Sequence, residues 1–126
     1  MPVSADVLDA LRHVTTATCT TVLLKKGLRN TWVRGAVPIA PGQPRTVGPA
    51  FTLRFVPYRE DLAGPQSWSS PRSTRACVEA MPAGAMVVID AMGDRQAGVF
   101  GDILCQRMVA RGVAGMATDG VVRDLA

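Results

Sequence analysis

The chain has 126 residues, which suffices for one domain with its own hydrophobic core but leaves no room for a second. Apolar residues make up 48% and charged residues 19%, which excludes an intrinsically disordered chain, and the longest apolar or small run, 83–89, is far shorter than the roughly 20 residues of a membrane helix. The net charge of +4 comes from basic residues scattered over the first half without interleaved aromatics, so neither a membrane nor nucleic acid is an expected partner.

Two short helices are predicted at the start of the chain. Residues 5–13 place apolar side chains at helical spacing behind Ser4, a typical N-cap, and residues 15–26 form a second helical stretch that ends at Gly27.

The next part is rich in proline, glycine and β-branched residues. AVPIA (36–40) and FTLRFVP (51–57) are predicted as strands, and Phe51, Leu53 and Phe55 alternate with polar residues as in a half-buried strand. Residues 58–70 lack periodicity and are predicted as a loop. Ser70 and Pro71 then resemble the cap and first turn of a helix that runs to about Met81.

The last part predicts a strand, helix, strand unit. MVVID (86–90) has the pattern of a strand covered on both faces, residues 102–111 form an amphipathic helix, VAGMAT (113–118) is another buried strand, and DGVVRD (119–124) leads into a helical start. The apolar side of the helix comprises Leu104, Cys105, Met108 and Val109. Parallel crossovers of this kind bind ligands at the carboxyl ends of their strands.

These elements predict a layered α/β fold in one domain, 1–126, with at least four strands. Its parts are N-terminal helices (1–30), a strand-rich part (31–57) and a site-bearing α/β part (70–126).

Several kinds of active site are not expected, because the residues that they need are absent or badly placed. His13 is the single histidine and reads as an exposed helix end, which argues against a serine or cysteine triad. No cysteine pair has zinc-ligand spacing, and the adjacent Lys25 and Lys26 are poor candidates for a Schiff base. The odd number of widely spaced cysteines and an N-terminus without a secretory pattern indicate a reducing, cytoplasmic setting.

Asp102 begins the predicted helix after the sequence GVFG. Helix-start amides attract anions, and Gly98 and Gly101 would let a ligand approach the backbone, although Asp102 could equally be a simple dipole partner. Arg123 and Asp124 follow the next strand. Arginine can grip a carboxylate in two places and aspartate offers a hard oxygen to Mg²⁺ or Mn²⁺, whereas the plain alternative is a surface ion pair.

At these residues the chain resembles a known family. The run PAGAMVVIDAMGDRQAGVFGDILCQRMVARGVAGMATDGVVRD resembles the RraA-like family, which includes class II 4-hydroxy-4-methyl-2-oxoglutarate/4-carboxy-4-hydroxy-2-oxoadipate aldolases and the RraA regulators of ribonuclease E. The aldolase signature is an aspartate, twenty intervening residues, then Arg-Asp. Asp102, residues 103–122 and Arg123-Asp124 match it in full. The fold that this resemblance implies is the family's swivelling β/β/α type.

The resemblance implies roles for these residues. Arg123 would bind the pyruvate carboxylate, Asp124 would coordinate Mg²⁺ or Mn²⁺ directly, and Asp102 would act through a metal-bound water. Backbone amides of Gly101, Asp102, Ile103 and Leu104 would bind substrate oxygens. The RraA regulators lack the Arg-Asp pair, so its presence favours the enzymatic branch.

The resemblance also implies a longer chain and an assembly. Family members continue past this motif and receive an acidic side chain from a neighbouring subunit, so we expect a C-terminally truncated chain and a homo-oligomer, either a trimer or a hexamer.

The expected function is a metal-dependent lyase that releases pyruvate from 4-hydroxy-2-oxo acids or decarboxylates oxaloacetate. The alternatives are a non-catalytic regulator of ribonuclease E and a different metal-dependent lyase or hydratase acting on sugar acids. Trp68, Arg72 and Arg75 are candidates for a lid that selects the aldehyde half of the substrate.

Overall fold

The computed structural model describes residues 3–124. The chain divides between Val47 and Gly48 into two compact units. The first contains α1 (Ala5–Arg12) and α2 (Thr16–Lys25), which confirms both predicted helices. The Ser4 side chain accepts a hydrogen bond from the Val7 amide, and Gly27 ends α2 with a φ of +82°.

The predicted strand at residues 36–40 is wrong. This segment contains no regular secondary structure, and Val37 and Ile39 are exposed. Pro38 has no amide hydrogen to donate to a ladder, so the apolar alternation around it does not produce a strand.

The second unit is built on a parallel sheet with the strand order β1-β2-β3. The strands are β1 (Ala50–Arg54), β2 (Met86–Asp90) and β3 (Gly115–Thr118), so the described residues form three strands where at least four are predicted. Arg54 lies opposite Asp90, and Ile89 lies opposite Thr118. All three carboxyl ends therefore meet at one edge of the sheet, as the crossover pattern predicts.

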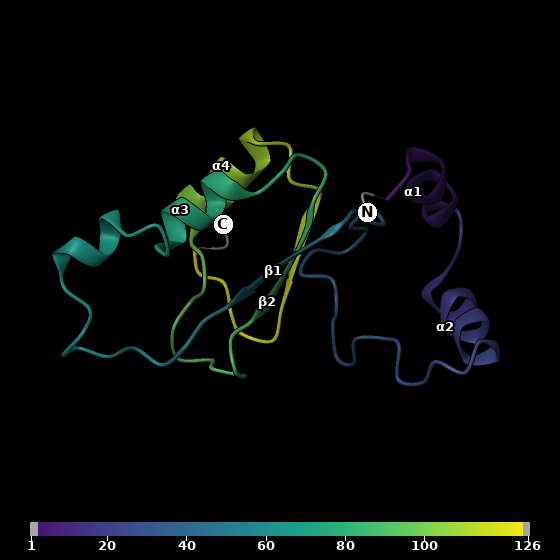
Figure 1. The fold of residues 1–126 in the computed structure, drawn as a ribbon, viewed down its shortest axis with the longest axis horizontal. Coiled ribbons are helices and arrows are strands. Elements are labelled where there is room, and N and C mark those ends of the chain that lie inside the picture. Colours follow the sequence, from purple (N-terminus) through teal and green to yellow (C-terminus); the bar gives the residue numbers. More distant parts are fainter. Residues whose placement is uncertain (1–2, 125–126) are drawn as a thin grey trace. The chain divides into compact units, whose positions relative to one another are not determined.

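Two helices cover one face of this sheet. Figure 1 shows α3 (Thr74–Ala80) and α4 (Asp102–Ala110) side by side on it. The core between helices and sheet consists of buried apolar side chains, chiefly Val78, Met81, Val87, Ile89, Phe100 and Met108. Arg107 of α4 and Arg111, the residue that follows this helix, donate hydrogen bonds to Glu79 of α3. These bonds hold the two helices together.

Several local predictions need correction. The N-cap of α3 is Ser73, whose side chain accepts a hydrogen bond from the Ala76 amide, and not the predicted Ser70. Ser70 instead follows a separate 3₁₀ helix, η1 (Pro65–Ser69), in the segment predicted as a loop. Val88 of β2 is 36% exposed, so this strand is not covered on both faces. Val109 is 71% exposed and does not belong to the buried side of α4.

The segment after β3 is also different from its prediction. Residues 119–124 are not helical, because Val121 forms a parallel bridge with Gly98 and the backbone continues beside the loop that precedes α4. Within residues 3–124, no helix is long and apolar enough to cross a lipid bilayer.

Candidate functional site

The candidate site lies where the loop before α4 meets the segment after β3. The Val99 amide donates to the Val121 carbonyl at 2.8 Å, and the Arg123 amide donates to the Phe100 carbonyl at 3.1 Å. These bonds hold the two segments side by side in a fixed register. They bring Arg123 and Asp124 to the start of α4, although more than twenty residues of chain separate them from Gly101.

Gly101 allows a very close approach at this point. A Cβ atom built on Gly101 would lie 2.6 Å from Asp124 Oδ2 and 3.0 Å from Arg123 Nε. A Cβ on Gly98 would lie 3.2 Å from the Arg123 Cβ. Any larger residue at Gly101 would therefore displace the ends of the Arg123 and Asp124 side chains from their present positions.

Arg123 and Asp124 also lie beside each other. The Arg123 Nε is 3.4 Å from Asp124 Oδ2, and both side chains are largely open to solvent, at 74% and 52% exposure. Asp124 has a φ of +60°, a conformation that aspartate tolerates better than most residues. The pair presents one planar cation and one hard anion to a ligand at the surface.

The start of α4 offers backbone amides to an anion. Gly101 is its N-cap and has no side chain that could accept a hydrogen bond from the first helical amides. Asp102 Oδ1 accepts the Ile103 amide at 2.7 Å, so Asp102 partly satisfies its own helix start, as the plain interpretation predicts. Asp102 and Ile103 are exposed, while Gly101 and Leu104 are half-buried.

Asp119 holds the loop after β2, a role that the sequence analysis missed. Its Oδ1 accepts the Ala91 amide at 2.6 Å and its Oδ2 accepts the Gly93 amide at 2.8 Å. An aspartate followed by glycine directly after a predicted parallel strand is the signal that could have identified it, because such positions lie at the ligand-binding edge.

A charged pair marks the same edge of the sheet. Arg54 Nε donates to Asp90 Oδ2 at 2.7 Å, and Asp90 Oδ1 accepts the Met92 amide at 2.9 Å. The Met92 amide and, after it, the Arg54 guanidinium lower the pKa of Asp90. The Asp90 carboxylate therefore stays ionised, and both of its oxygens already accept hydrogen bonds. These properties make it a poor proton acceptor for chemistry at this edge.

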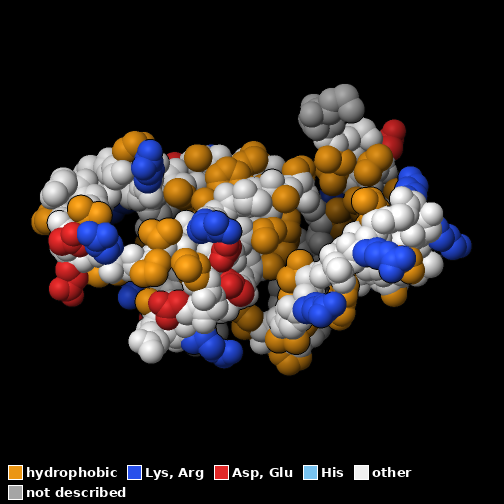
Figure 2. Space-filling model, turned by 60° about the horizontal axis from the view of Figure 1, so that its bottom comes forward, with side chains coloured by type: hydrophobic (Ala, Val, Ile, Leu, Met, Phe, Trp, Pro, Cys, Tyr) orange, Lys and Arg blue, Asp and Glu red, His pale blue; other side chains and the backbone are white. Residues whose placement is uncertain are grey.

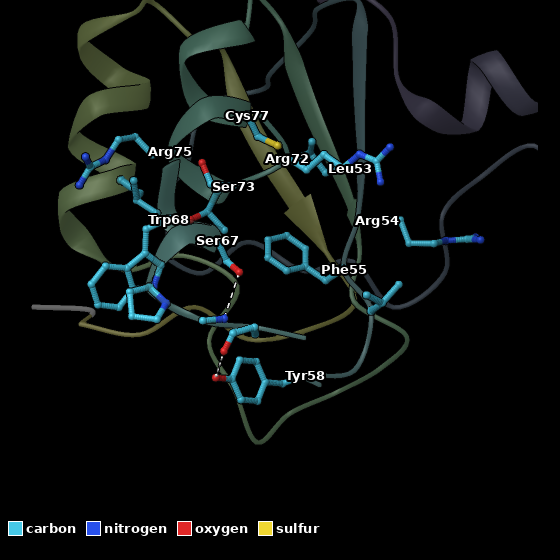
Figure 3. Close-up of a pocket in the computed structure, with 16 residues that line it drawn as sticks. Leu53, Arg54, Phe55, Tyr58, Ser67, Trp68, Arg72, Ser73, Arg75 and Cys77 are labelled. Atoms are coloured by element: carbon cyan, nitrogen blue, oxygen red, sulfur yellow. Dashed lines mark hydrogen bonds between the residues drawn. The ribbon is translucent and has the colours of Figure 1, made fainter. Parts of the chain in front are cut away.

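A cavity of about 720 Å³ opens beside α4 (Figure 3). Leu104 contributes to its wall, together with the three residues predicted as a lid, Trp68, Arg72 and Arg75. Its other lining residues include the rings of Phe55 and Tyr58 and no acidic side chain. In Figure 3 the Arg54 side chain extends away from Trp68, consistent with its bond to Asp90. Arg123 and Asp124 are not part of the lining.

A divalent ion at this site would have to rely on few protein ligands. Within residues 3–124, no three acidic, histidine or cysteine side chains lie close enough to hold a metal together. Mg²⁺ commonly uses only one or two carboxylates and completes its shell with waters and substrate oxygens, and the solvent-open Asp124 can serve in that way. Burial and then the charge of Asp102 raise the pKa of Cys105, which favours the neutral thiol.

Comparisons with known proteins identify the family of the chain. A family model described as RraA-like, Aldolase/RraA, matches residues 4–126. A crystal structure of Streptomyces coelicolor RraAS2, described as an unusual member of the RNase ES inhibitor RraA protein family, is 30% identical with a TM-score of 0.83. An uncharacterized protein from Pseudomonas syringae pv. tomato is 28% identical with a TM-score of 0.79. No curated protein matches the chain.

The chain is shorter than both of these relatives. Each comparison covers 98% of this chain, but only 58% of the Streptomyces protein and 51% of the Pseudomonas protein. The chain therefore spans little more than half the length of the structures it resembles.

Proposed function

Because the chain belongs to the RraA-like family, we propose that it is a divalent-metal-dependent lyase that releases pyruvate from 2-oxo acids. The reactions are aldol cleavage of 4-hydroxy-2-oxo acids, decarboxylation of oxaloacetate, or both. The observation that carries the proposal is the juxtaposition of Arg123 and Asp124 with Gly101, at the start of α4. An exposed ion pair elsewhere on the surface would not need a glycine to admit it.

Each residue of the site has a proposed task. The Arg123 guanidinium binds the substrate carboxylate through two parallel hydrogen bonds. The Leu104 amide binds a remaining oxygen, and the Ile103 amide joins it by exchanging Asp102 Oδ1 for a substrate oxygen. Asp124 would hold Mg²⁺ or Mn²⁺, which when bound supplies a concentrated positive charge for the oxygens of a 2-oxo acid. Asp102 positions a water that takes up a proton.

The aldol reaction then balances without a covalent intermediate. As the C3–C4 bond breaks, the proton of the substrate hydroxyl passes through the water to the Asp102 carboxylate, which leaves a carbonyl product and the enolate of pyruvate. The positive Arg123 guanidinium favours this enolate, and protonation at C3 gives pyruvate. Decarboxylation of oxaloacetate produces the same enolate with CO₂ as the other product. No lysine is needed, and Lys25 and Lys26 lie at the end of α2 in the other unit.

An assay of pyruvate release tests the proposal. Oxaloacetate and a branched 4-hydroxy-2-oxo acid are supplied with and without Mg²⁺ to the longest form of the chain that can be produced. We expect turnover with Mg²⁺ or Mn²⁺ and none after EDTA treatment, because the site offers oxygen ligands. Full activity after exhaustive chelation would contradict the mechanism.

Substitutions at the pair separate an enzyme from a regulator. Arg123→Ala should weaken binding of oxalate, a planar mimic of the enolate. The loss should be about 2–4 kcal/mol if bound oxalate desolvates the guanidinium, which is open to solvent in the free chain. Asp124→Ala should abolish Mg²⁺ binding. Asp94→Ala is the matched control, since the Asp94 side chain bonds the Gln96 amide of its own loop. Titration calorimetry measures both affinities. Wild-type pyruvate release in both variants would show that the pair does not carry the lyase reaction, whereas a wild-type chain that releases no pyruvate would favour the regulator.

The regulator is the second candidate, and one observation favours it. The Streptomyces relative that is 30% identical is described as belonging to a family of RNase ES inhibitors. Inhibition of a ribonuclease E-type enzyme by the wild-type chain and equally by Arg123→Ala would support this function. The cytoplasmic setting is part of both proposals, and the free thiols of Cys19, Cys77 and Cys105 are compatible with it.

A further inference from the structure

We infer that Asp119 is a positioning residue, which fixes where Arg123 and Asp124 lie relative to the start of α4. The inference rests on the proposed function, because it assigns Asp119 a task in that site. Asp119 itself lies at the end of β3 and belongs to no part of the binding machinery described above.

Both oxygens of the Asp119 carboxylate are occupied by one loop. Oδ1 accepts the Ala91 amide at 2.6 Å and Oδ2 accepts the Gly93 amide at 2.8 Å. These amides belong to the turn that leaves β2, where Met92 has a φ of +57°. A carboxylate that accepts two backbone amides is a strong attachment, because hydrogen bonds to a charged acceptor are stronger than neutral ones.

Gly120 brings the two segments into direct contact beside this attachment. A Cβ atom on Gly120 would lie 2.7 Å from the Ala91 Cβ and 3.2 Å from the Asp94 carbonyl oxygen. The Gly120 backbone therefore lies directly against the Ala91 methyl group and the loop that follows it. This contact allows the Asp119 carboxylate to reach the Ala91 and Gly93 amides.

The same alignment continues to the candidate site. Beyond Asp119, the Val121 carbonyl accepts the Val99 amide, and the Arg123 amide donates to the Phe100 carbonyl. Residues 119–124 are thus attached to residues 91–101 at their beginning and near their end. The intervening residues 92–98 are exposed, so few packing contacts add to the attachment that Asp119 provides.

The neighbouring carboxylates do not duplicate this role. Asp90 holds the Met92 amide at 2.9 Å, but Asp90 belongs to β2 and so ties the loop to its own strand. Asp94 accepts the Gln96 amide within the loop. Asp119 is the carboxylate that joins the loop to the segment carrying Arg123 and Asp124.

The experiment compares Asp119→Ala, Asp119→Asn and the matched control Asp94→Ala. Hydrogen exchange of the Val99 and Arg123 amides reports on the register without any need for activity. In Asp119→Ala both amides should exchange faster, while amides of β2 and β3 keep their wild-type rates. Oxalate affinity and turnover per folded molecule should fall about 10- to 100-fold, as for other supporting residues around metal sites.

Asp119→Asn should lie between the wild type and Asp119→Ala, because its side-chain carbonyl can still accept one of the two amides. It also keeps the test possible if Asp119→Ala does not fold. Asp94→Ala should match the wild type in every measurement.

The outcomes distinguish this inference from the proposed function. If the wild type neither binds oxalate nor releases pyruvate, the proposed function fails, while the exchange of Val99 and Arg123 still tests the geometry. Wild-type exchange and wild-type oxalate affinity in Asp119→Ala would overturn the inference. A uniform increase in exchange over the whole sheet would also overturn it, because that pattern indicates lost stability rather than lost position.

Discussion

The position of Asp124 in the candidate site depends on the absence of a side chain at Gly101. Its φ of −108° and ψ of −176° suit any residue, so Gly101→Ala should leave the fold unstrained. The new Cβ would nevertheless lie 2.6 Å from Asp124 Oδ2 and force this carboxylate away. We expect an unchanged melting temperature and a loss of Mg²⁺ and oxalate affinity of about 100-fold, because small displacements in such sites have large effects.

Gly98→Ala provides the graded comparison for this prediction. Its Cβ would lie 3.2 Å from the Arg123 Cβ and Cγ atoms, a contact that a small shift can relieve. Its effect on oxalate affinity should therefore be weaker than that of Gly101→Ala. Equal affinities in Gly101→Ala and the wild type would show that Asp124 does not need its present position.

At the scale of elements, an ion cluster joins the two helices over the sheet. Arg107 Nε donates to Glu79 Oε1 at 2.7 Å, and Arg111 Nη1 donates to Glu79 Oε2 at 3.1 Å. The hydrogen bond from Arg107, followed by the charges of both arginines, lowers the pKa of Glu79. The stabilisation is therefore present above the pKa of the unfolded glutamate and is lost as the pH falls through the lower pKa of the folded state.

Thermal unfolding at a series of pH values tests this coupling. Between about pH 5 and pH 3, where carboxylates titrate, the melting temperature of the wild type should fall more steeply than that of Glu79→Gln. The glutamine variant keeps the shape of the side chain and lacks its titration. Parallel pH profiles of the two proteins would show that the cluster does not link α3 to α4. Since these side chains are exposed, the difference should also shrink at high salt.

The cavity beside α4 makes a prediction about substrate choice. Arg72 and Arg75 line it without an acidic neighbour in the lining, and Leu104 connects it to the helix start. Arg72→Ala and Arg75→Ala should raise the KM for a 4-hydroxy-2-oxo acid with an acidic distal group by about tenfold, the value of one modest charged contact. Oxaloacetate should be cleaved as by the wild type. Arg95→Ala serves as the control, and an equal effect on both substrates would remove the cavity from the reaction.

The sequence predicts these elements with uneven success, for physical reasons. Both N-terminal helices, the three strands and α4 follow from periodicity and caps, because these signals are local. Ser73 was missed as the cap of α3 because Ser70 and Pro71 carry an equally good local signal. The exposed Val109 and Val88 show that an apolar residue need not be buried within one chain.

The candidate site was predicted in part, and the missing part is tertiary. Asp102, Arg123 and Asp124 follow from helix-start chemistry and from the family signature, and the crossover predicts that they share one edge. The tasks of Asp119 and Gly101 depend on distances between segments that no local pattern contains. The predicted helical start at 119–124 was wrong because pairing with Gly98 holds this segment extended.

On the scale of the whole molecule, the sheet leaves strand edges and apolar side chains open. Within residues 3–124, β1 and β3 each pair with β2 alone. Apolar side chains reach the surface at many points (Figure 2), among them Val56, Leu62 and Trp68 of the second unit. Open strand edges and exposed apolar groups favour association. We therefore predict that the protein is a homo-oligomer in solution, with a trimer or a hexamer as the expected state.

Sedimentation at several concentrations, combined with an intact-mass measurement, tests this prediction. The expected result is a species with a mass several times the 13.3 kDa of the chain. A folded, monodisperse 13.3 kDa monomer with normal lyase activity would contradict it, and would show that no acidic group from a neighbouring subunit is needed.

The exclusively parallel pairing of the strands also has a consequence for folding kinetics. Arg54 of β1 bonds Asp90 of β2 across 36 positions of the chain, so their ladder closes only after a long loop has been ordered. The chain loses conformational entropy when this loop closes, before the contacts between the strands have formed to compensate for it. This order slows the formation of such sheets. The crossover from β2 through α4 to β3 is the shorter excursion, so we expect this unit to form first. Docking of β1 then completes the edge at which Asp90 meets its arginine.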